Sequence, residues 1–168
     1  MENLRLDDRE LRAAIGKLQR TGANMAPVFA GIGRAFKARI QIGYRNQTDP
    51  YGNAWPALKS RRGKALRDRG NLRDAWDYTA GADQVELVNN RQVSHRGRTF
   101  SLAAIHHFGA TIKPREDGPG VLLFKAGGKD VAAKQVTIPP RRQFPDEGLP
   151  DAWLADALRV IERHFRRA

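Results

Sequence analysis

The chain has 168 residues, 40% hydrophobic and 29% charged, a balance that excludes wholesale disorder and is typical of one soluble domain. Its 30 lysines and arginines against 18 acidic residues give a net charge of +12, which favours acidic partners, nucleic acid among them. The absence of cysteine excludes disulfides and thiolate metal sites, and no apolar run approaches the roughly 20 residues that span a bilayer.

Two helices are predicted within residues 1–42. The first begins near Asp7, which can cap a helix together with Glu10 three residues later. The second is expected to be longer, with Pro27 tolerated in its first turn. Its apolar residues recur every three or four positions, at Met25, Phe29, Ile32, Phe36 and Ile40.

A long basic loop is predicted over residues 43–71, which are rich in Gly, Pro, Asn and Arg and have no sustained periodicity. Loops of this length are usually functional or disordered. The part over 59–69 combines charge and glycine with little apolar anchoring, so we expect it to be mobile in the free protein and ordered on assembly. Asn71 can cap a helical turn that follows.

Three strands are predicted in the second half of the chain, over 83–89, 121–125 and 134–138, from alternating or continuous apolar residues. Asp151 can cap a final helix. Its apolar face is predicted to contain Leu154, Leu158, Ile161 and Phe165. The expected fold class is α+β in a single domain over 1–168: N-terminal helices, a small antiparallel sheet with long loops, and a C-terminal helix.

The adjacent pair His106 and His107 is the most obvious candidate for chemistry. Neighbouring residues point about 100° apart on a helix and to opposite faces of a strand, so the pair cannot easily share one ion; metal-binding histidines on a helix stand at i and i+4. We therefore predict a structural pair, with Phe108 anchoring the core and Gly109 allowing a turn.

Other catalytic templates are missing as well. The sequence has no phosphate-binding glycine loop and no nucleophile elbow, and Asp74 and Asp77 beside Arg73 are typical of a solvated helix. The predicted protein is not an enzyme and needs no metal or cofactor. Basic runs interleaved with Tyr51, Trp55 and Trp76 leave an alternative open, a DNA-binding accessory protein without sequence preference.

Five motifs in one order carry a resemblance to a known family. They are "TDPYGNAWPALKSRR", "LRDRGNLRDAW", "AAIHHFGATIKP", "VLLF" and "VTIPPRRQF". Together they resemble the phage virion morphogenesis family, the tail-completion proteins of Mu-like and related tailed phages, from about Phe36 to the C-terminus. The chain departs from the family at His107, where glutamine is expected, and at Arg142, where a proline tends to stand.

The resemblance implies a structural role in the virion, at the neck or the head-proximal end of the tail, with the host cytoplasm as the place of assembly. It implies a ring or collar of subunits, which needs heterologous interfaces, and contact with an adaptor or connector, a tail terminator or a tube protein. Non-specific contact with packaged DNA is expected, and contact with a membrane is not. The candidate contact residues are Asp49, Pro50, Trp55, Pro56, Arg61, Arg62, Lys64, Arg69, His106, His107, Arg141 and Phe144.

Overall fold

The computed structural model describes residues 9–20, 24–59, 62–68, 70–95, 97–116, 118–126 and 128–166. Its helices are α1 (Arg9–Arg20), α2 (Ala26–Asn46), α3 (Asn71–Asp74), α4 (Leu102–Phe108) and α5 (Asp151–Phe165). Its strands are β1 (Trp76–Ala80), β2 (Val85–Asn89), β3 (Gln92–His95), β4 (Arg98–Ser101), β5 (Ala110–Ile112), β6 (Leu122–Ala126), β7 (Lys129–Ala133) and β8 (Val136–Ile138). The expected α+β class is confirmed.

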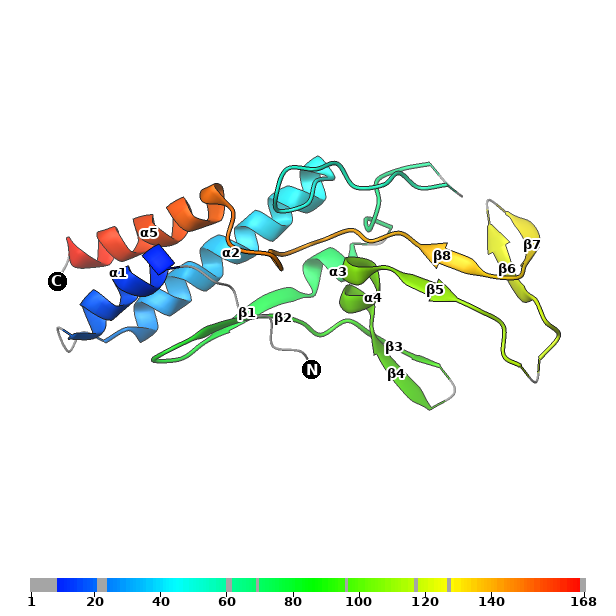
Figure 1. Ribbon diagram of the computed structural model, residues 1–168, viewed down its shortest axis with the longest axis horizontal. Helices are drawn as coiled ribbons and strands as arrows, with labels where there is room; N and C mark the ends of the chain where they lie inside the picture. The colour runs from blue at the N-terminus through cyan, green and yellow to red at the C-terminus, as the bar shows by residue number, and fades with distance from the viewer. Residues whose placement is uncertain are drawn as a thin grey trace.

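The molecule is elongated, with its long helices toward one end and most of its strands toward the other (Figure 1). The long helix α2 is the central element: α5 packs against it, α1 packs against α5, and the β1–β2 hairpin packs against α2. The remaining strand pairs extend away from the long helices α1, α2 and α5, and β3–β4 contacts the short helix α4 (Figure 1). The core therefore follows the length of α2.

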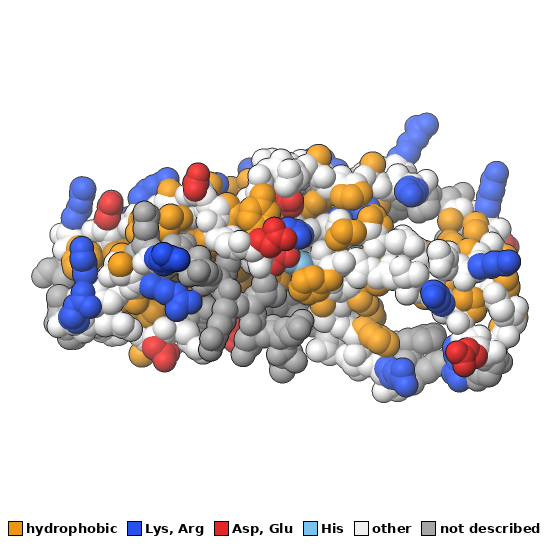
Figure 2. Space-filling model, in the orientation of Figure 1, with side chains coloured by type: hydrophobic (Ala, Val, Ile, Leu, Met, Phe, Trp, Pro, Cys, Tyr) orange, Lys and Arg blue, Asp and Glu red, His pale blue; other side chains and the backbone are white. Residues whose placement is uncertain are grey.

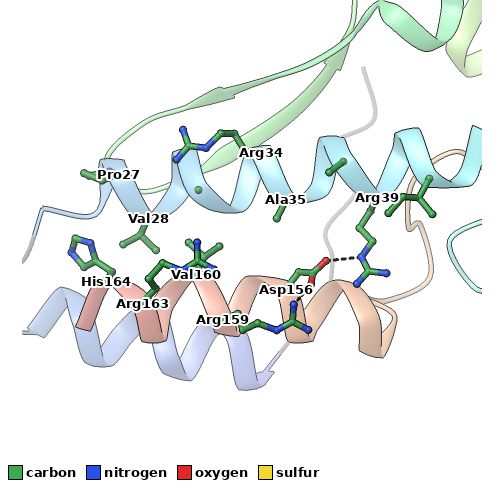
Figure 3. A pocket seen from close by; sticks show the side chains of 13 residues that line it. Pro27, Val28, Arg34, Ala35, Arg39, Asp156, Arg159, Val160, Arg163 and His164 are labelled. Carbon is green, nitrogen blue, oxygen red and sulfur yellow. Dashed lines mark hydrogen bonds and ion pairs between the residues drawn. The ribbon is translucent and has the colours of Figure 1, made fainter. Parts of the chain in front are cut away.

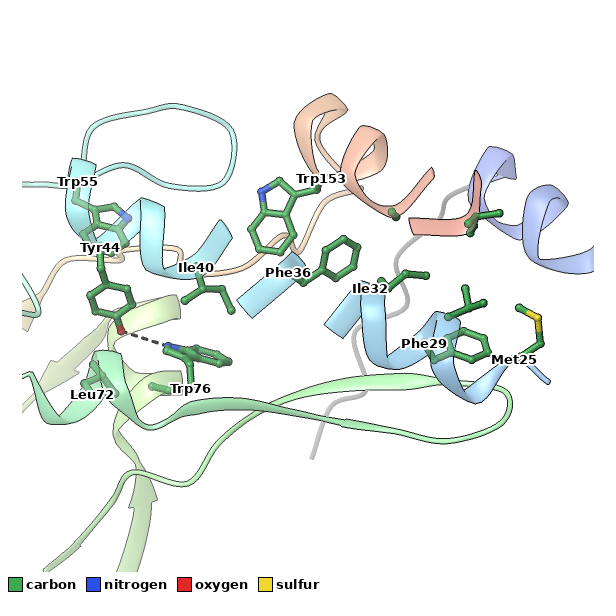
Figure 4. Packing of buried hydrophobic residues seen from close by; sticks show 14 of the residues in the cluster. Met25, Phe29, Ile32, Phe36, Ile40, Tyr44, Trp55, Leu72, Trp76 and Trp153 are labelled. Carbon is green, nitrogen blue, oxygen red and sulfur yellow. Dashed lines mark hydrogen bonds between the residues drawn. The ribbon is translucent and has the colours of Figure 1, made fainter. Parts of the chain in front are cut away.

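The predicted apolar stripe of α2 is confirmed, because Phe29, Ile32, Phe36 and Ile40 are all buried. Figure 4 shows these side chains in one row with Met25 at one end and Tyr44 at the other. The ring of Phe36 packs against that of Trp153 in α5, with centroids 5.1 Å apart. Aromatic side chains such as these bury about 150–250 Å² each, so they contribute strongly to the stability of the core.

Two glycines inside α2 let neighbouring elements approach closely. A Cβ atom added at Gly31 would lie 2.6 Å from Val160 Cγ1 of α5, and one added at Gly33 would overlap the ring of Tyr78 in β1. Glycine lowers the stability of a helix interior. Both glycines serve packing, one on the α5 side of α2 and the other on the β1–β2 side.

The strands form four separate two-stranded antiparallel ribbons and not one sheet. Three are hairpins of consecutive strands, namely β1–β2, β3–β4 and β6–β7, whereas β5–β8 joins Ala110 to Ile138 across the longer interval that contains β6 and β7. The predicted strands over 83–89, 121–125 and 134–138 correspond to β2, β6 and β8. The other five strands are short or contain polar residues in a weak pattern, which is why the apolar pattern did not indicate them.

Several predicted boundaries are wrong. Helix α2 continues to Asn46, so the loop begins at Gln47 and not at Gly43; Gln47 ends the helix in the left-handed region, with φ of 62°. Asn71 is the first residue of α3 and not its cap, because Gly70 precedes it with φ of 80°. The expected cap at Asp7 lies outside the described residues.

The C-terminal helix also differs in detail from the prediction. Pro150 holds the N-cap position, and Asp151 is the first helical residue without a capping bond. The buried face contains Trp153, Ala157 and Ile161, while the expected Phe165 is 46% exposed. The stripe is therefore rotated toward Trp153, since the large indole is the side chain that fills the space beside Phe36.

Candidate functional site

The turn after α2 is built by Asp49. Its Oδ1 accepts hydrogen bonds from the backbone N–H groups of Tyr51 at 2.9 Å and Asn53 at 2.8 Å, and its Oδ2 accepts one from Asn53 Nδ2 at 2.9 Å. Gly52 takes φ of 92° within this turn, a conformation that favours glycine. Asp49 and Pro50 thus shape the path of the chain toward Trp55.

Trp55 is a core residue of the chain itself, only 7% exposed. The edge of its indole meets the ring of Tyr44 at 89°, with centroids 5.2 Å apart. Its Nε1–H donates to the backbone oxygen of Arg142 at 2.9 Å. Trp55 therefore anchors the long loop on two segments, α2 and the chain between β8 and α5 (Figure 4).

Arg141 ties the chain between β8 and α5 to the long loop and to α4. Its side chain is buried, and its Nε and Nη2 donate to the oxygen of Pro56 at 2.9 and 2.7 Å. Its backbone N–H donates to the oxygen of His106 at 2.7 Å. Burial lowers the pKa of the guanidinium, which nevertheless stays protonated in a protein.

His107 occupies the position in the core that was expected for Phe108. Its ring is fully buried and stacks on Phe144 at 4.0 Å between centroids. Its Nδ1 accepts from the backbone N–H of Gln143 at 3.1 Å, so its Nε2 carries the proton and donates to Asp146 Oδ2 at 3.2 Å. Phe108 is the next residue of α4, so its side chain points about 100° away from that of His107. It is 56% exposed, and its predicted role as a core anchor is wrong.

The binding pattern of His107 is compatible with the glutamine that the family resemblance led us to expect at this position. A neutral imidazole with an accepting Nδ1 and a donating Nε2 presents one acceptor and one donor, as a glutamine amide does. A glutamine at position 107 could therefore make the same kinds of hydrogen bond to Gln143 and Asp146 as His107 does.

His106 lies in a different setting from its neighbour. Its Nδ1 is buried and has no hydrogen-bond partner among the described residues. Burial, and then the charge of Arg141, lower the pKa of His106. In the described part of the chain no three His, Cys, Asp or Glu side chains are grouped so as to hold a metal ion.

Gln143 is a central residue that the sequence analysis missed. Its Oε1 accepts from Tyr44 Oη at 2.6 Å and from Trp76 Nε1 at 3.2 Å, and its Nε2 donates to the oxygen of Ala103 at 3.1 Å. Burial raises the pKa of the Tyr44 phenol. Nothing in the local pattern around Gln143 indicates that it is buried; only its place in the family motif "VTIPPRRQF", directly after two arginines, pointed to the segment.

Residues of four of the five family motifs thus meet in one place, which we name the motif junction: Trp55, Pro56, Trp76, His106, His107, Arg141, Gln143 and Phe144. The fifth motif, "VLLF", lies mostly in β6 and is not part of the junction. Tyr51 extends the junction, because its hydroxyl oxygen accepts from the backbone N–H groups of Asp146 and Glu147 at 3.0 and 2.8 Å. Phe144 contacts both Trp76 and His107. At the junction Trp55, Trp76, His107, Arg141 and Gln143 are buried against other parts of the chain, whereas Pro56 is exposed.

The junction predicts an acid sensitivity. Burial, the largest effect, lowers the pKa of His107 below its ordinary value of 6.5 against the opposing effect of Asp146. The folded chain then binds fewer protons than the unfolded chain, so stability is complete above about pH 6.5 and falls as the pH drops below it. His106 contributes with the same sign. Denaturant titrations at pH 7.5, 6.5 and 5.5 measure the effect.

His107→Gln is the matched variant for this test, because it keeps one donor and one acceptor and cannot be protonated. We expect it to reduce the loss of stability between pH 7.5 and 5.5, with the remainder due to His106. A variant that loses stability with pH as steeply as the wild type would contradict this account of His107.

The basic residues of the loop that were candidate contact residues lie outside the motif junction. Arg62 and Lys64 are exposed, and Lys64 Nζ donates to the oxygen of Arg45 at 2.8 Å. Between them and the core, Ala65 is buried and both its backbone groups bond to the side chain of Gln47. The segment 59–69 is therefore anchored at Ala65, contrary to the expectation of little anchoring; Arg61 and Arg69 lie outside the described residues.

Exposed apolar side chains gather on the ribbons. Leu123 of β6 is 74% exposed, and its neighbour Phe124 is also exposed. On β3–β4, the cross-strand partners Val93 and Phe100 are both exposed. Figure 2 shows hydrophobic and basic side chains side by side at the end of the molecule where β6 and β7 lie. The β3–β4 and β6–β7 ribbons therefore carry exposed apolar side chains.

Comparison with known proteins identifies the family. The family model described as the phage virion morphogenesis family matches residues 6–163. The chain belongs to this family. The match begins well before Phe36, so it includes all of α1 and the first half of α2, which the motif order alone did not cover.

Membership of the virion morphogenesis family makes the chain a structural or assembly protein of a phage. No match was found among curated proteins or among solved structures. Within the described residues, no helix is both long and apolar enough to cross a membrane.

Proposed function

We propose that this virion morphogenesis protein completes the tail of a tailed phage, or joins head to tail in the neck, by assembling there as a ring or collar of subunits. The observation that carries the proposal is the family match over residues 6–163. The partners would be an adaptor or connector, a tail terminator or a tube protein. The site of action would be the virion, after assembly in the host cytoplasm, and no enzymatic step is involved.

The free-standing ribbons support self-association. A two-stranded ribbon alone is marginally stable in water and usually gains stability from a third strand or a helix. The β6–β7 ribbon has no extensive contact with another described element and exposes Leu123. In a ring, such a ribbon of one subunit would pack against a different patch of the next, as a heterologous interface requires.

The charge of the chain supports contact with packaged DNA. A surface that carries a net +12 would lower the cost of placing a protein collar beside phosphates. The same charge favours the second candidate function, a DNA-binding accessory protein without sequence preference. We keep the proposal that the exposed basic part of the loop around Arg62 and Lys64 becomes more ordered on assembly.

Deleting the gene tests the proposal. We expect filled heads and separate tails, or tails with an abnormal end, with normal DNA replication, because assembly and not replication would lack a component. Electron microscopy of lysates and quantification of phage DNA measure the two effects. Normal infectious particles would contradict the proposal, and a loss of replication would favour the DNA-binding candidate.

Complementation of the gene deletion by variants tests whether the β6–β7 ribbon forms the interface. Leu123→Ser is expected to leave the fold intact, since Leu123 is mostly exposed, and to complement the deletion poorly. Lys129→Ser on the neighbouring strand of the same ribbon is the matched control, because it removes an exposed side chain without removing apolar surface. Equal complementation by both variants would locate the interface elsewhere.

A further inference from the structure

A groove of about 670 Å³ runs along the surface between α2 and α5. Ala35 and Ala38 of α2 and Val160 of α5 contribute to its floor, and Gly31 brings the two helices close together at Val160. Figure 3 shows Ala35 and Val160 in the space between the two helices. The groove is separate from both the motif junction and the β6–β7 ribbon.

Arginines line both sides of this groove. Arg34 and Arg39 come from α2, and Arg159 and Arg163 come from α5 (Figure 3). The one carboxylate in its described lining is Asp156, which accepts from Arg39 Nε at 2.6 Å and from Arg159 Nη1 at 3.0 Å. Four guanidinium groups against one carboxylate leave an excess of positive charge along an apolar floor.

Arg34 and Arg163 carry the excess positive charge that the described residues do not neutralise. Both side chains are exposed, and neither forms a hydrogen bond or an ion pair with the described residues. Arg34 stands on the α2 side of the groove and Arg163 on the α5 side (Figure 3). A ligand in the groove would therefore meet an unpaired cation on each flank.

We propose that the α2–α5 groove binds an amphipathic helix of an acidic partner protein. The apolar face of that helix would lie on Ala35, Ala38 and Val160, and its Asp and Glu side chains would pair with Arg34 and Arg163. The α2 residues that line the groove run from Pro27 to Ile42, about 22 Å at ~1.5 Å per residue. The groove thus matches a helix of about four turns.

The floor favours a protein helix over DNA. Phosphates would gain from the arginines but nothing from the alanines, the valine or Ile42, which is exposed at one end of the groove. An amphipathic helix buries these apolar groups and pairs the cations at the same time. The inference does not depend on where in the virion the chain acts, so its failure would leave the proposed function standing.

Binding of defined probes to the isolated full-length chain tests the groove. The main probe is a stapled helical peptide of about four turns with a leucine stripe flanked by glutamates; a scrambled peptide of the same composition and a DNA duplex are the comparisons. Fluorescence anisotropy gives the dissociation constants. We expect the amphipathic peptide to bind at least about tenfold more tightly than the scrambled one, since only the former presents both an apolar face and acidic flanks.

Variants separate the contribution of the flanking arginines to peptide binding from that of the apolar floor. Arg34→Glu with Arg163→Glu removes the flanking cations. Ala38→Trp fills the floor of the groove with a bulky ring, and Ile42→Glu places a charge on it; both positions are exposed. Each should weaken peptide binding by about tenfold or more. Arg98→Glu with Lys129→Glu is the control, because it makes the same change of charge at exposed positions on the ribbons and should leave binding almost unchanged.

The proposal is overturned if the amphipathic peptide does not bind, if the scrambled peptide binds equally, or if neither floor variant weakens binding. Duplex binding that is lost in the double arginine variant but kept in both floor variants, without peptide binding, would identify the groove as a nucleic-acid site instead. Circular dichroism of each variant confirms that its helices are intact.

Discussion

Replacing Trp55 with alanine is expected to destabilise the folded chain by about 3–5 kcal/mol, the range for removing a buried tryptophan. The indole is buried against Tyr44 and donates its N–H to the backbone oxygen of Arg142. Its loss would leave a cavity beneath the loop and an unpaired carbonyl. For a domain of this size the melting temperature should fall by roughly 6–20 °C. Thermal and denaturant unfolding of the free protein measure the effect.

Trp55→Phe is the informative control. It keeps an aromatic ring against Tyr44 but removes the donor to Arg142, so we expect a loss of about 1–2 kcal/mol. The sequence alone allowed Trp55 to be a residue that a partner buries. A Trp55→Ala protein that melts normally but fails to enter particles would restore that interpretation and contradict the one drawn from burial.

Replacing Arg141 with alanine is expected to destabilise the chain by about 2–4 kcal/mol, because a buried guanidinium that binds carbonyl oxygens is removed and those oxygens lose their donors. The oxygen of Pro56 accepts from both Nε and Nη2. Arg141→Lys should recover only part of this loss, since an ammonium group cannot reproduce the paired donors of the planar group. Denaturant unfolding gives the three free energies.

The neighbouring Arg142 is the matched control for Arg141. Its side chain is about one-third exposed and forms ion pairs with Asp146 and Glu147; pairs of this kind contribute about 1 kcal/mol or less. We therefore expect Arg142→Ala to be much milder than Arg141→Ala. Equal effects of the two substitutions would show that the buried contact with Pro56 is not what stabilises the junction.

The sequence by itself determined the long elements of the fold. The apolar spacing from Met25 to Ile40 is a local property of the chain, and it predicted the central helix with its buried face. The α+β class and the strands β2, β6 and β8 followed from the same kind of local pattern. The order of short motifs indicated the family, because such an order can be recognised without knowing what the residues touch.

The tertiary structure decided the role of each motif residue. In the sequence, Trp55 and Arg141 lie in proline-containing segments and His107 lies beside a second histidine, and all three were candidate contact residues. In the folded chain they bind groups many residues away, on Arg142, Asp146 and Pro56 respectively. No periodicity of the neighbouring sequence reports such long-range partners, because hydrogen bonds between distant segments leave no local pattern.

The same reason explains why the sequence did not show the α2–α5 groove. Arg34 and Arg163 are far apart in the chain and read as ordinary charged positions on two helix surfaces. Only the packing of α5 on α2 at Gly31 and Val160 places them on opposite sides of one apolar floor. Local patterns determined which helices form, and the close approach of those helices determined which surface they present together.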